Sequence, residues 1–477
     1  MKTHHSKGSS LSFPEKTFDL ADDLRQIVAA RPVRTRVVAL ALFLLCIIFW
    51  SSGAIGRLQN RLDHSALRSE DSRPPGCWDF PVANDTLLVI KTGSTELEDR
   101  FAVHLSTTLR CVPNYMIFSD LEETYHGEHI YDTLDSASPE IRDNNKDFEL
   151  YRRLQRGGRQ VLDPSELSGT PEAFSNTGGN QENAGWKLDK WKFMPMVNRT
   201  FHEYPDMKWY VFIEADTFLL WTMLQQYLSR LDHTKAIYAG SPSFIADELF
   251  AHGGSGFILS QPALSSVATY YASHKPEIEQ LTEGHWAGDC VLGIFTRRSG
   301  VQFHNIWPHF QGDYPGLLPY ARADGRPVMD DKLREWCYPT VSYHHMSSDM
   351  IRDFWHFEQE WAKSHDQTET LLNKDVFRDF VMPQMMEGKA DWDNLSDAEV
   401  ADAKSVEECR TRCEVQPDCK QYSFETATRK CRTRIDPRLG KPTNGTISHW
   451  LWSRVQHFEQ DMAPCGAESW RDPYVWP

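Results

Sequence analysis

The sequence is short of positive charge. Its 477 residues include 51 lysines and arginines against 67 aspartates and glutamates, which gives a formal net charge of −16. Proteins that bind nucleic acid carry basic patches, so this balance argues against a nucleic-acid partner. Internal repeats are also missing. With 40% hydrophobic and 25% charged residues the composition is that of a globular protein, long enough for a large core and two domains.

Two catalytic signatures are missing as well. The glycine-rich stretch at residues 251–260 is not followed by a lysine at the spacing of a phosphate-binding P-loop. No His-Glu-x-x-His or similar ligand spacing occurs, which argues against a metal-dependent hydrolase built on the adjacent residues His344 and His345.

An uncharged apolar stretch is present at residues 37–55, after a polar segment at residues 1–36. The stretch is long enough to cross a bilayer as a helix, although it is on the short side. It begins too late for an ordinary signal peptide and has no clear cleavage site. We therefore expect a transmembrane signal-anchor rather than a buried helix, with residues 1–36 as a cytoplasmic tail and the polar residues 56–78 as a stem.

The cysteines and glycosylation sequons indicate the compartment. Of 10 cysteines, four lie close together near the C-terminus without a histidine at zinc-finger spacing, which favours disulfides over zinc. Asn-x-Ser/Thr sequons follow the apolar stretch at Asn84, Asn198, Asn394 and Asn444. Both features place the C-terminal bulk of the chain in the secretory lumen. The short span fits a thin, early secretory membrane.

Residues 208–221 organise the rest of the chain. An aromatic and β-branched run predicts a buried strand, and two carboxylates, Glu214 and Asp216, follow at its end. Side chains two apart on extended backbone point the same way, and ligands of open α/β sheets lie at the carboxyl ends of strands. Mg²⁺ and Mn²⁺ take carboxylate oxygens and often bridge to phosphates. The pair could therefore hold a metal and a nucleotide diphosphate, or simply complement a helix dipole.

Two further predicted strands precede this stretch. Residues 86–91 lead into a turn at Thr92-Gly93, a helix is expected over residues 96–111, and residues 115–119 end at Asp120. This β–α–β order predicts a parallel sheet. Asp120 is a candidate contact for a ribose or base, or a cap for the next helix.

Lysine and glycine residues are further candidates for contacts with phosphates, sugar or acceptor. A helix is expected over residues 187–204, and the lysines near its start, Lys190 among them, either meet phosphates or form a solvated face. Gly253 and Gly254 permit close approach of the backbone to a ligand. We interpret them as a wall where sugar or acceptor meets the backbone.

Acidic and histidine residues complete the candidate site. Glu283 and Asp289 are both candidate bases near the start of a helix. Residues 338–346 predict a strand ending in His344 and His345. Neighbours on a strand face opposite ways, so only one of the two histidines could join a site with Glu214 and Asp216.

The C-terminal quarter differs in character. Residues 366–390 are charged and weakly patterned, which predicts a linker with some helix. Cys409 and Cys413 are four residues apart and therefore share one face of a short helix. Small disulfide-stapled modules of this kind usually bind rather than catalyse.

The order of these motifs resembles that of fringe-like and core 1 β-1,3-galactosyltransferase-like enzymes of glycosyltransferase family 31, particularly their fungal branch. The resemblance covers about residues 79–361, and residues 391–457 resemble a PAN/apple module. The motifs that carry it are residues 91–93, 118–120, 209–221, 253–256 and 341–344.

The resemblance implies an α/β fold of GT-A type, a Rossmann-like nucleotide-sugar-binding domain at residues 79–365. A small α+β PAN/apple-like module and tail would occupy residues 391–477. It also implies a Mn²⁺- or Mg²⁺-dependent, inverting reaction with a UDP-sugar donor. Asp216 would bind the metal directly, His344 would complete its shell, and Glu214 would contact the ribose, a metal-bound water or the metal. Residues on the donor side would be Lys91, Thr92, Gly93, Asp120, Lys190, Gly253 and Gly254.

Inversion requires one base to deprotonate the acceptor hydroxyl. Animal relatives carry acidic residues four and five places before the glycine that matches Gly288, and here those places hold Gly284 and Glu283. Asp289 is the other candidate, and we favour it because the fungal members centre on Gly-Asp at this point.

The PAN pattern implies the disulfides Cys409–Cys431 and Cys413–Cys419. We further expect Cys77–Cys111 and Cys290–Cys337, which leaves Cys465 free or intermolecular.

The sequence thus predicts a single-pass type II Golgi membrane glycosyltransferase. It would transfer a hexose, most readily galactose, from UDP to a glycan or glycoprotein acceptor in β-1,3 linkage. The alternative is a catalytically inactive luminal glycan-binding or scaffold protein with a glycosyltransferase-like domain. The sequence names neither the sugar, nor the acceptor, nor the oligomeric state.

Overall fold

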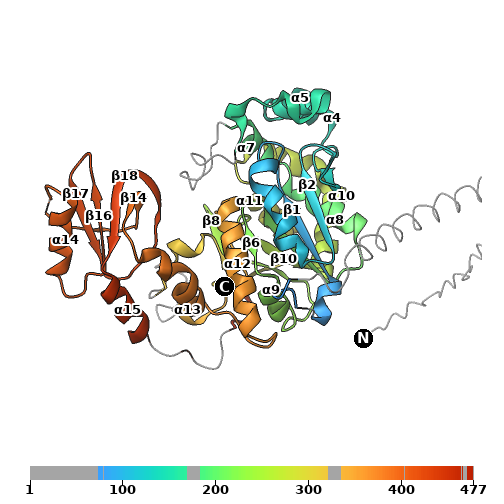
Figure 1. Cartoon of the computed structure of the whole chain (residues 1–477). Coiled ribbons are helices and arrows are strands. Elements are labelled where there is room, and N and C mark those ends of the chain that lie inside the picture. The colour runs from blue at the N-terminus through green and yellow to red at the C-terminus, as the bar shows by residue number, and fades with distance from the viewer. Residues whose placement is uncertain are drawn as a thin grey trace, which may run out of the picture. The chain divides into compact units, whose positions relative to one another are not determined.

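The computed structural model describes residues 74–475, except residues 79, 169–182, 321–334, 402, 463–464 and 466–469. Every described residue belongs to one compact unit, Arg73–Pro477 (Figure 1). The predicted tail, membrane span and most of the stem lie outside the described residues. Within the part that is described, no helix is long and apolar enough to cross a membrane.

A nine-stranded mixed sheet forms the centre of the larger domain. Strand β1 (Thr86–Lys91) pairs in parallel with β2 (Tyr115–Ser119) on one side and with β5 (Trp209–Glu214) on the other. The sequence predicted all three, because each is a short continuous apolar run. The strand order is β19-β11-β7-β10-β5-β1-β2-β4-β3. The remaining strands are β3 (Glu123–Tyr125), β4 (Glu128–Asp132), β7 (Tyr238–Gly240), β10 (Phe257–Ser260), β11 (Phe303–Asn305) and β19 (Tyr474–Val475).

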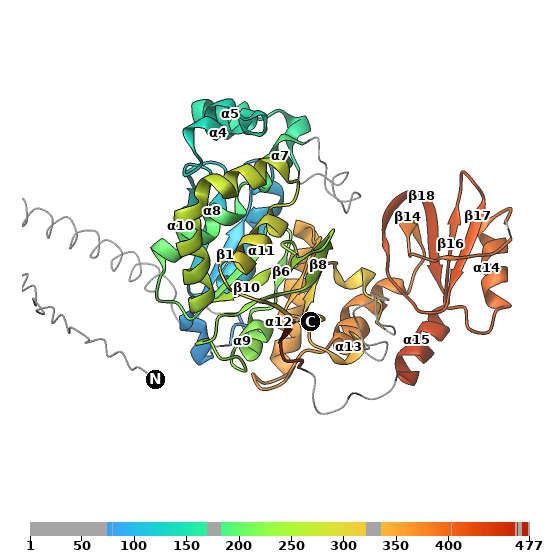
Figure 2. The ribbon, with the colours of Figure 1, turned by 180° about the vertical axis from the view of Figure 1, so that it is seen from behind.

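Helices cover both faces of this sheet, because successive strand residues point to opposite sides. Leu87 and Val89 pack on one side against α8 (Phe193–Glu203), α10 (Gln261–Gly284) and α11 (Gly288–Arg298), which Figure 2 shows in front of the sheet. Leu88 and Ile90 pack on the other side. Helices on that side are α3 (Ala102–Ser106), α9 (Trp221–Leu228) and α12 (Ser348–Ser364).

A smaller helical layer lies beside the sheet. Helices α4 (Pro139–Asn144), α5 (Glu149–Gly157) and α7 (Ala184–Asp189) contribute to a separate cluster around Phe148 and Trp191. The helix expected over residues 187–204 is therefore two helices, α7 and α8, which are separated at residues 190–192. The helix expected over residues 96–111 is also divided, into Leu97–Phe101, α3 and Thr108–Arg110.

Two short sheets position the candidate site. Strands β6 (Phe218–Leu219), β13 (Ser342–Tyr343) and β12 (Phe310–Gln311) form one, in which β13 lies antiparallel to β6. Strands β8 (Pro242–Ile245) and β9 (Glu248–Ala251) form a hairpin. The β6–β13 pairing joins segments more than 120 residues apart and brings the residues after β13 beside those before β6.

The segment predicted as a linker with some helix, residues 366–390, contains that helix and packs against the large domain. It forms α13 (Asn373–Val376) and two further helical turns, Phe377–Val381 and Met382–Met385. Phe377, Val381 and Met385 are fully buried in the core of the large domain. Leu371 and Val376 are buried with them, whereas Met386 is 61% exposed. The surrounding charges masked this packing pattern in the sequence.

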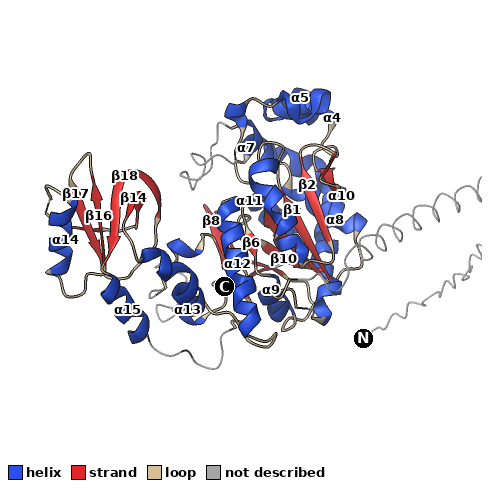
Figure 3. Cartoon of the chain, in the orientation of Figure 1, coloured by secondary structure: helices blue, strands red, loops and turns tan. Residues whose placement is uncertain are grey.

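The C-terminal module is a separate five-stranded antiparallel sheet with two helices (Figure 3). Its strands are β14 (Lys389–Asp393), β15 (Ala398–Glu399), β16 (Gln421–Glu425), β17 (Lys430–Arg434) and β18 (Lys441–Trp450). Its helices are α14 (Val406–Glu414) and α15 (Trp452–Asp461). The predicted disulfides Cys409–Cys431 and Cys413–Cys419 are confirmed.

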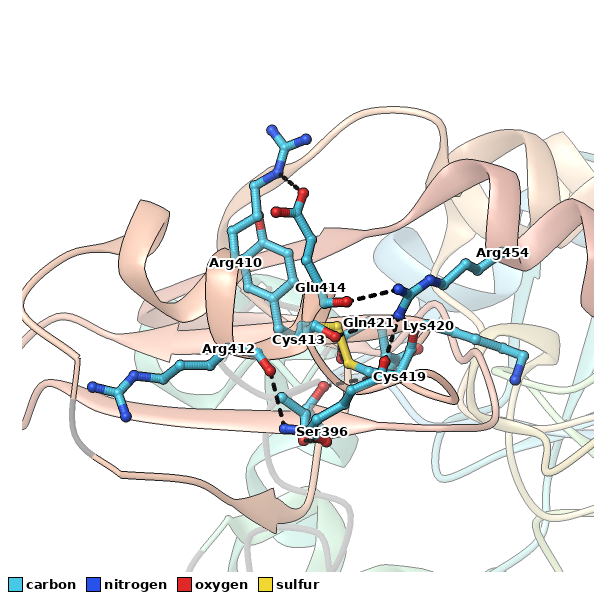
Figure 4. The surroundings of a disulfide bond; sticks show 12 residues. Ser396, Arg410, Arg412, Cys413, Glu414, Cys419, Lys420, Gln421 and Arg454 are labelled. Atoms are coloured by element: carbon cyan, nitrogen blue, oxygen red, sulfur yellow. Dashed lines mark hydrogen bonds and ion pairs between the residues drawn. A yellow bond between two sulfur atoms is a disulfide. The ribbon is translucent and has the colours of Figure 1, made fainter.

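Arg454 fixes α15 to the disulfide-bonded loop (Figure 4). Its guanidinium donates to the carbonyl oxygens of Glu414 at 2.8 Å and of Gln416 and Cys419 at 2.7 Å each. The small module thus uses two disulfides and this arginine where a larger apolar core is missing.

One predicted glycosylation site does not fit the folded module. Asn394 is fully buried, and its Nδ2, the atom that would carry the sugar, donates to the carbonyls of Tyr422 and His449. The side chain of Asn394 serves instead as a buried, hydrogen-bonded amide. Asn84 and Asn444 are exposed and Asn198 is half-buried, and their glycosylation stays a prediction.

The remaining disulfides differ from expectation in part. Cys77–Cys111 is confirmed, whereas Cys290–Cys337 is wrong, because Cys337 pairs with Cys465. Cys290 is a free, buried thiol in α11. The last described residues also return to the large domain: β19 pairs with β11, and Trp470 packs against Tyr227. The C-terminal tail is therefore part of the central sheet rather than of the module.

Candidate functional site

Three predicted ligand residues converge at the carboxyl end of β5. Glu214 ends that strand, Asp216 follows two residues later, and His344 follows β13. One ligand atom from each lies within 4.8 Å of the others. His344 Nε2 lies 3.2 Å from Asp216 Oδ1 because β13 pairs with β6, which begins two residues after Asp216. The sequence prediction that these residues meet is confirmed by this geometry.

Gly254 leaves the space that His344 occupies. A Cβ at position 254 would lie 2.1 Å from Cε1 of the imidazole, so no larger residue fits there without a shift. Thr217 Oγ1 donates to the Gly254 carbonyl at 2.6 Å and holds this stretch against the end of β5. Gly254 is therefore packed against the histidine, and the contact of Gly253 and Gly254 with a sugar or acceptor stays a prediction. His344 Nδ1 is buried and makes no hydrogen bond.

His345 does not point away from His344, as the alternation of a strand would require. Its φ is 55°, so its backbone has left the extended conformation. The two imidazole rings stack with centroids 3.9 Å apart, and His345 Nδ1 lies 3.4 Å from Asp313 Oδ1. His344 still provides the contact to Asp216.

Two cations surround the acidic pair. Arg100 Nη1 lies 3.1 Å from Asp216 Oδ2, and Lys91 Nζ lies 3.1 Å from Glu214 Oε1 and also contacts Asp189. Burial would raise the pKa of Asp216, but the charges of His344 and Arg100 outweigh it and hold that pKa far below its usual range. Asp216 is therefore a carboxylate at any physiological pH.

The same charges act on the partners. Burial would lower the pKa of His344, but the neighbouring Asp216 outweighs it and the pKa is raised. Burial would also lower the pKa of Lys91, yet Asp189 and Glu214 raise it. The site is thus a network of buried and half-buried charges whose members stabilise one another, the usual environment of a functional site.

Asp120 has a supporting position. It is fully buried, accepts from the backbone N–H and hydroxyl of Ser94 at 2.9 and 2.5 Å, and pairs with Lys192 Nζ at 3.0 Å. Lys192 is only 2% exposed and also donates to the Thr92 carbonyl at 2.8 Å. A Cβ at Gly93 would lie 3.0 Å from Lys192 Nζ. The turn at Thr92-Gly93 is therefore built on a buried ion pair, and Lys192 is not part of a solvated face.

Lys190 lies apart from the acidic cluster. Its Nζ pairs with Asp147 at 2.8 Å and donates to the Glu283 carbonyl at 3.2 Å. The first contact joins the end of α7 to the turn Lys146–Phe148, and the second joins it to the end of α10. The structure shows no contact between Lys190 and Glu214 or Asp216.

The two candidate bases have different surroundings. Asp289 lies in the first turn of α11 and accepts from the backbone N–H of Gly253 and of Cys290, each at 2.8 Å. Burial raises its pKa to about 6, and the Glu214 charge adds to this effect. Glu283 is exposed and accepts from Asn145 Nδ2 at 2.8 Å. Asp289 is the base that shares an electrostatic environment with Glu214 and Lys91.

Sequence reasoning missed Arg100, Asp189 and the buried role of Lys192. Arg100 follows Glu96 by four residues and pairs with it, so the sequence offers only the signal of an ordinary helix-surface ion pair. Asp189 and Lys192 lie in a charged run that resembles a solvated face. Their roles depend on a neighbouring strand, which local spacing does not reveal.

Comparison with protein families agrees with the motif order. A family described as Fringe-like matches residues 172–311, and a PAN domain matches residues 388–437. The first match includes Glu214, Asp216, Gly254 and Asp289. The chain is therefore similar to fringe-like glycosyltransferases and carries a C-terminal PAN domain, as the sequence predicted. A Fringe-like domain supports glycosyltransferase activity in general terms.

Proposed function

We propose that this protein is an inverting, metal-dependent glycosyltransferase of GT-A type that transfers a hexose from a UDP-sugar to an acceptor hydroxyl. The observation that carries the proposal is the convergence of Glu214, Asp216 and His344 at the end of β5, within or beside the Fringe-like region. Ligands of open α/β sheets bind at this end of the strands.

The donor set fits a divalent cation such as Mn²⁺ or Mg²⁺. Two carboxylates and an imidazole supply hard oxygen ligands and one nitrogen. Asp216 is kept ionised, and Gly254 leaves room for the imidazole. Asp216 and His344 would hold the cation. Glu214 is longer and pairs with Lys91, so it suits a ribose or a metal-bound water. When bound, the cation stabilises negative charge on the leaving diphosphate.

Asp289 is our candidate for the residue that removes the proton from the attacking acceptor hydroxyl. A general base works best when its pKa lies near the working pH. With a pKa of about 6, Asp289 is mostly ionised at pH 7 and is more basic than an exposed aspartate. The Gly253 N–H fixes its carboxylate. Glu283 has no such environment.

The finer assignment follows the resemblance. We take the donor as UDP-galactose, the linkage as β-1,3, and the acceptor as a glycan or glycoprotein. The four disulfides and the sequons at Asn84, Asn198 and Asn444 agree with an oxidising secretory compartment. We place the protein in the Golgi membrane, as a single-pass type II protein with a luminal catalytic domain.

The test uses the full-length chain from a secretory host. UDP release is recorded with a panel of UDP-sugars, with Mn²⁺ and with EDTA. One donor should be turned over in a Mn²⁺-dependent manner. Asp216→Asn should abolish this turnover, and Asp349→Asn, at an exposed position, should leave it unchanged. Turnover that survives both EDTA and Asp216→Asn would refute the proposal.

The rival function is an inactive luminal scaffold. It is favoured by the Glu at position 214, where many relatives carry Asp, and by the engagement of that Glu with Lys91. The scaffold function would be supported if the protein bound UDP in a metal-dependent manner but neither released UDP from any UDP-sugar nor transferred a sugar to any acceptor tested.

A further inference from the structure

Three aromatic rings lie parallel to one another in the two segments that carry Asp189 and Asp289. Trp286 lies in the connection between α10 and α11, and its side chain is 54% exposed. The Trp186 ring of α7 lies parallel to it, with centroids 6.4 Å apart and planes 8° apart. The His285 ring is also parallel, at 6.3 Å and 11°. We call these three residues the aromatic platform.

Both tryptophans are close to the charged centre along the chain. Trp286 precedes the candidate base Asp289 by three residues. Trp186 precedes Asp189 by three residues, and Asp189 contacts Lys91 beside Glu214. Three residues span at most about 10 Å. The backbone of Trp286 is therefore at most about 10 Å from that of Asp289, the proposed base. A bound sugar can span a distance of this size.

The connection that carries Trp286 is held in place. His285 Nδ1 accepts from the Ala287 N–H at 3.0 Å. A Cβ at Gly288 would lie 2.6 Å from the Lys190 Cα, so this segment packs directly on the end of α7. Lys190 Nζ donates back to the Glu283 carbonyl. An exposed indole on a fixed backbone is pre-organised for a ligand, since little freedom is lost on binding.

We propose that Trp286, backed by Trp186, is an acceptor subsite that stacks on the terminal hexopyranose of a neutral glycan. One face of a pyranose ring presents several C–H groups, which fit the electron-rich face of an indole and exclude water between them. The hydroxyls at the rim of the ring remain free for polar partners. This inference rests on the proposed function and names the class of its acceptor.

The surroundings favour a glycan over a peptide. Among the described residues, Trp286 is the only large exposed apolar side chain between positions 245 and 385. Its near neighbours in sequence, Glu283 and Gly284, are exposed and not apolar. A protein or peptide interface surrounds its anchoring aromatics with further apolar contacts, whereas an aromatic platform followed by exposed polar residues matches one sugar ring.

The experiment measures glycan binding directly, without turnover. Saturation-transfer NMR on the full-length protein is recorded with methyl β-galactoside, methyl β-glucoside, methyl α-mannoside and lactose. Trp286→Ala is compared with Trp286→Phe, which keeps a ring, and with Phe244→Ala, which removes another exposed aromatic. Binding of UDP with Mn²⁺ is measured on every variant as a check of fold and donor site.

At least one glycan should show saturation concentrated on the C–H protons of one ring face. Trp286→Ala should weaken it about tenfold or more, the size expected for loss of a central aromatic contact. Trp286→Phe should recover part of the affinity, and Phe244→Ala should change nothing. Unchanged glycan binding in Trp286→Ala, no glycan binding at all, or Trp286-dependent binding of an unglycosylated serine-rich peptide instead would each overturn the inference. Glycan binding at Trp286 with no UDP–Mn²⁺ binding would sink the proposed function alone.

Discussion

Asp289 should determine the acidic limb of the pH dependence of transfer. Its pKa is raised to about 6, mainly by burial and also by the Glu214 charge. The reactive form is the carboxylate, so activity rises as pH increases through that value. A group with a pKa near 6 is roughly 90% ionised at pH 7 and only about 10% ionised at pH 5. We therefore expect kcat/KM to fall about tenfold for each pH unit below 6.

The assay is acceptor-dependent UDP release at low substrate concentrations, between pH 4.5 and 8 at constant ionic strength. Asp289→Asn removes the base and should lower kcat by roughly 10²- to 10⁴-fold, the usual contribution of general-base catalysis. Its residual rate should lack the limb near pH 6. Glu283→Gln, at the competing candidate base, should keep the wild-type rate and the acidic limb of the pH profile. A wild-type profile that is flat to pH 5, or loss of activity in Glu283→Gln with Asp289→Asn active, would refute the assignment.

Three further predictions concern the metal, a disulfide and a buried acid. Asp216→Asn should lose Mn²⁺ binding in titration calorimetry, and retained affinity would argue against the acidic cluster as the metal site. Replacing Cys337 and Cys465 by alanine removes a bridge across 128 residues. From the loss of loop-closure entropy in the unfolded chain, this bridge should stabilise the folded state by roughly 5 kcal/mol. Urea unfolding should show a large loss of stability, whereas Cys290→Ala, at the free thiol, should cost less and leave sensitivity to reductant unchanged. Burial raises the pKa of Glu358 from 4.5 to about 8, so the folded state holds a proton that the unfolded chain has released in this range. Stability should fall as pH rises from about 4.5 to 8, by on the order of 4 kcal/mol, and a Glu358→Gln variant that keeps this slope would exclude Glu358 as its source.

The sequence predicted the centre of the sheet and the three proposed ligands. Strands β1, β2 and β5 were recognisable because buried parallel strands are continuous apolar runs. Glu214 and Asp216 share a direction because of the period of an extended chain. His344 was predicted as a ligand from the order of motifs. The structure gives the physical reason why it meets Asp216, which is the β13–β6 pairing.

The remaining features depend on contacts between distant segments. The ion pair of Lys192 with Asp120 crosses from the start of α8 to the end of β2, so a local charge run could not reveal it. The conformation of His345 follows from a positive φ that a strand pattern does not predict. The partner of Cys337 could not be chosen from spacing, because several cysteines are compatible with one disulfide until their positions in space are known.

The Cys337–Cys465 bridge has a consequence for how the chain can be cut. Cys337 lies before the PAN domain and Cys465 after it, so residues 337–465 form a closed covalent ring that contains the whole module. One proteolytic cut between the large domain and the PAN domain opens this ring without separating the two pieces. The fragments should migrate together on a non-reducing gel and separate only when the disulfide is reduced. Release of the PAN domain in an oxidising compartment would therefore require two cuts, one on either side of the module.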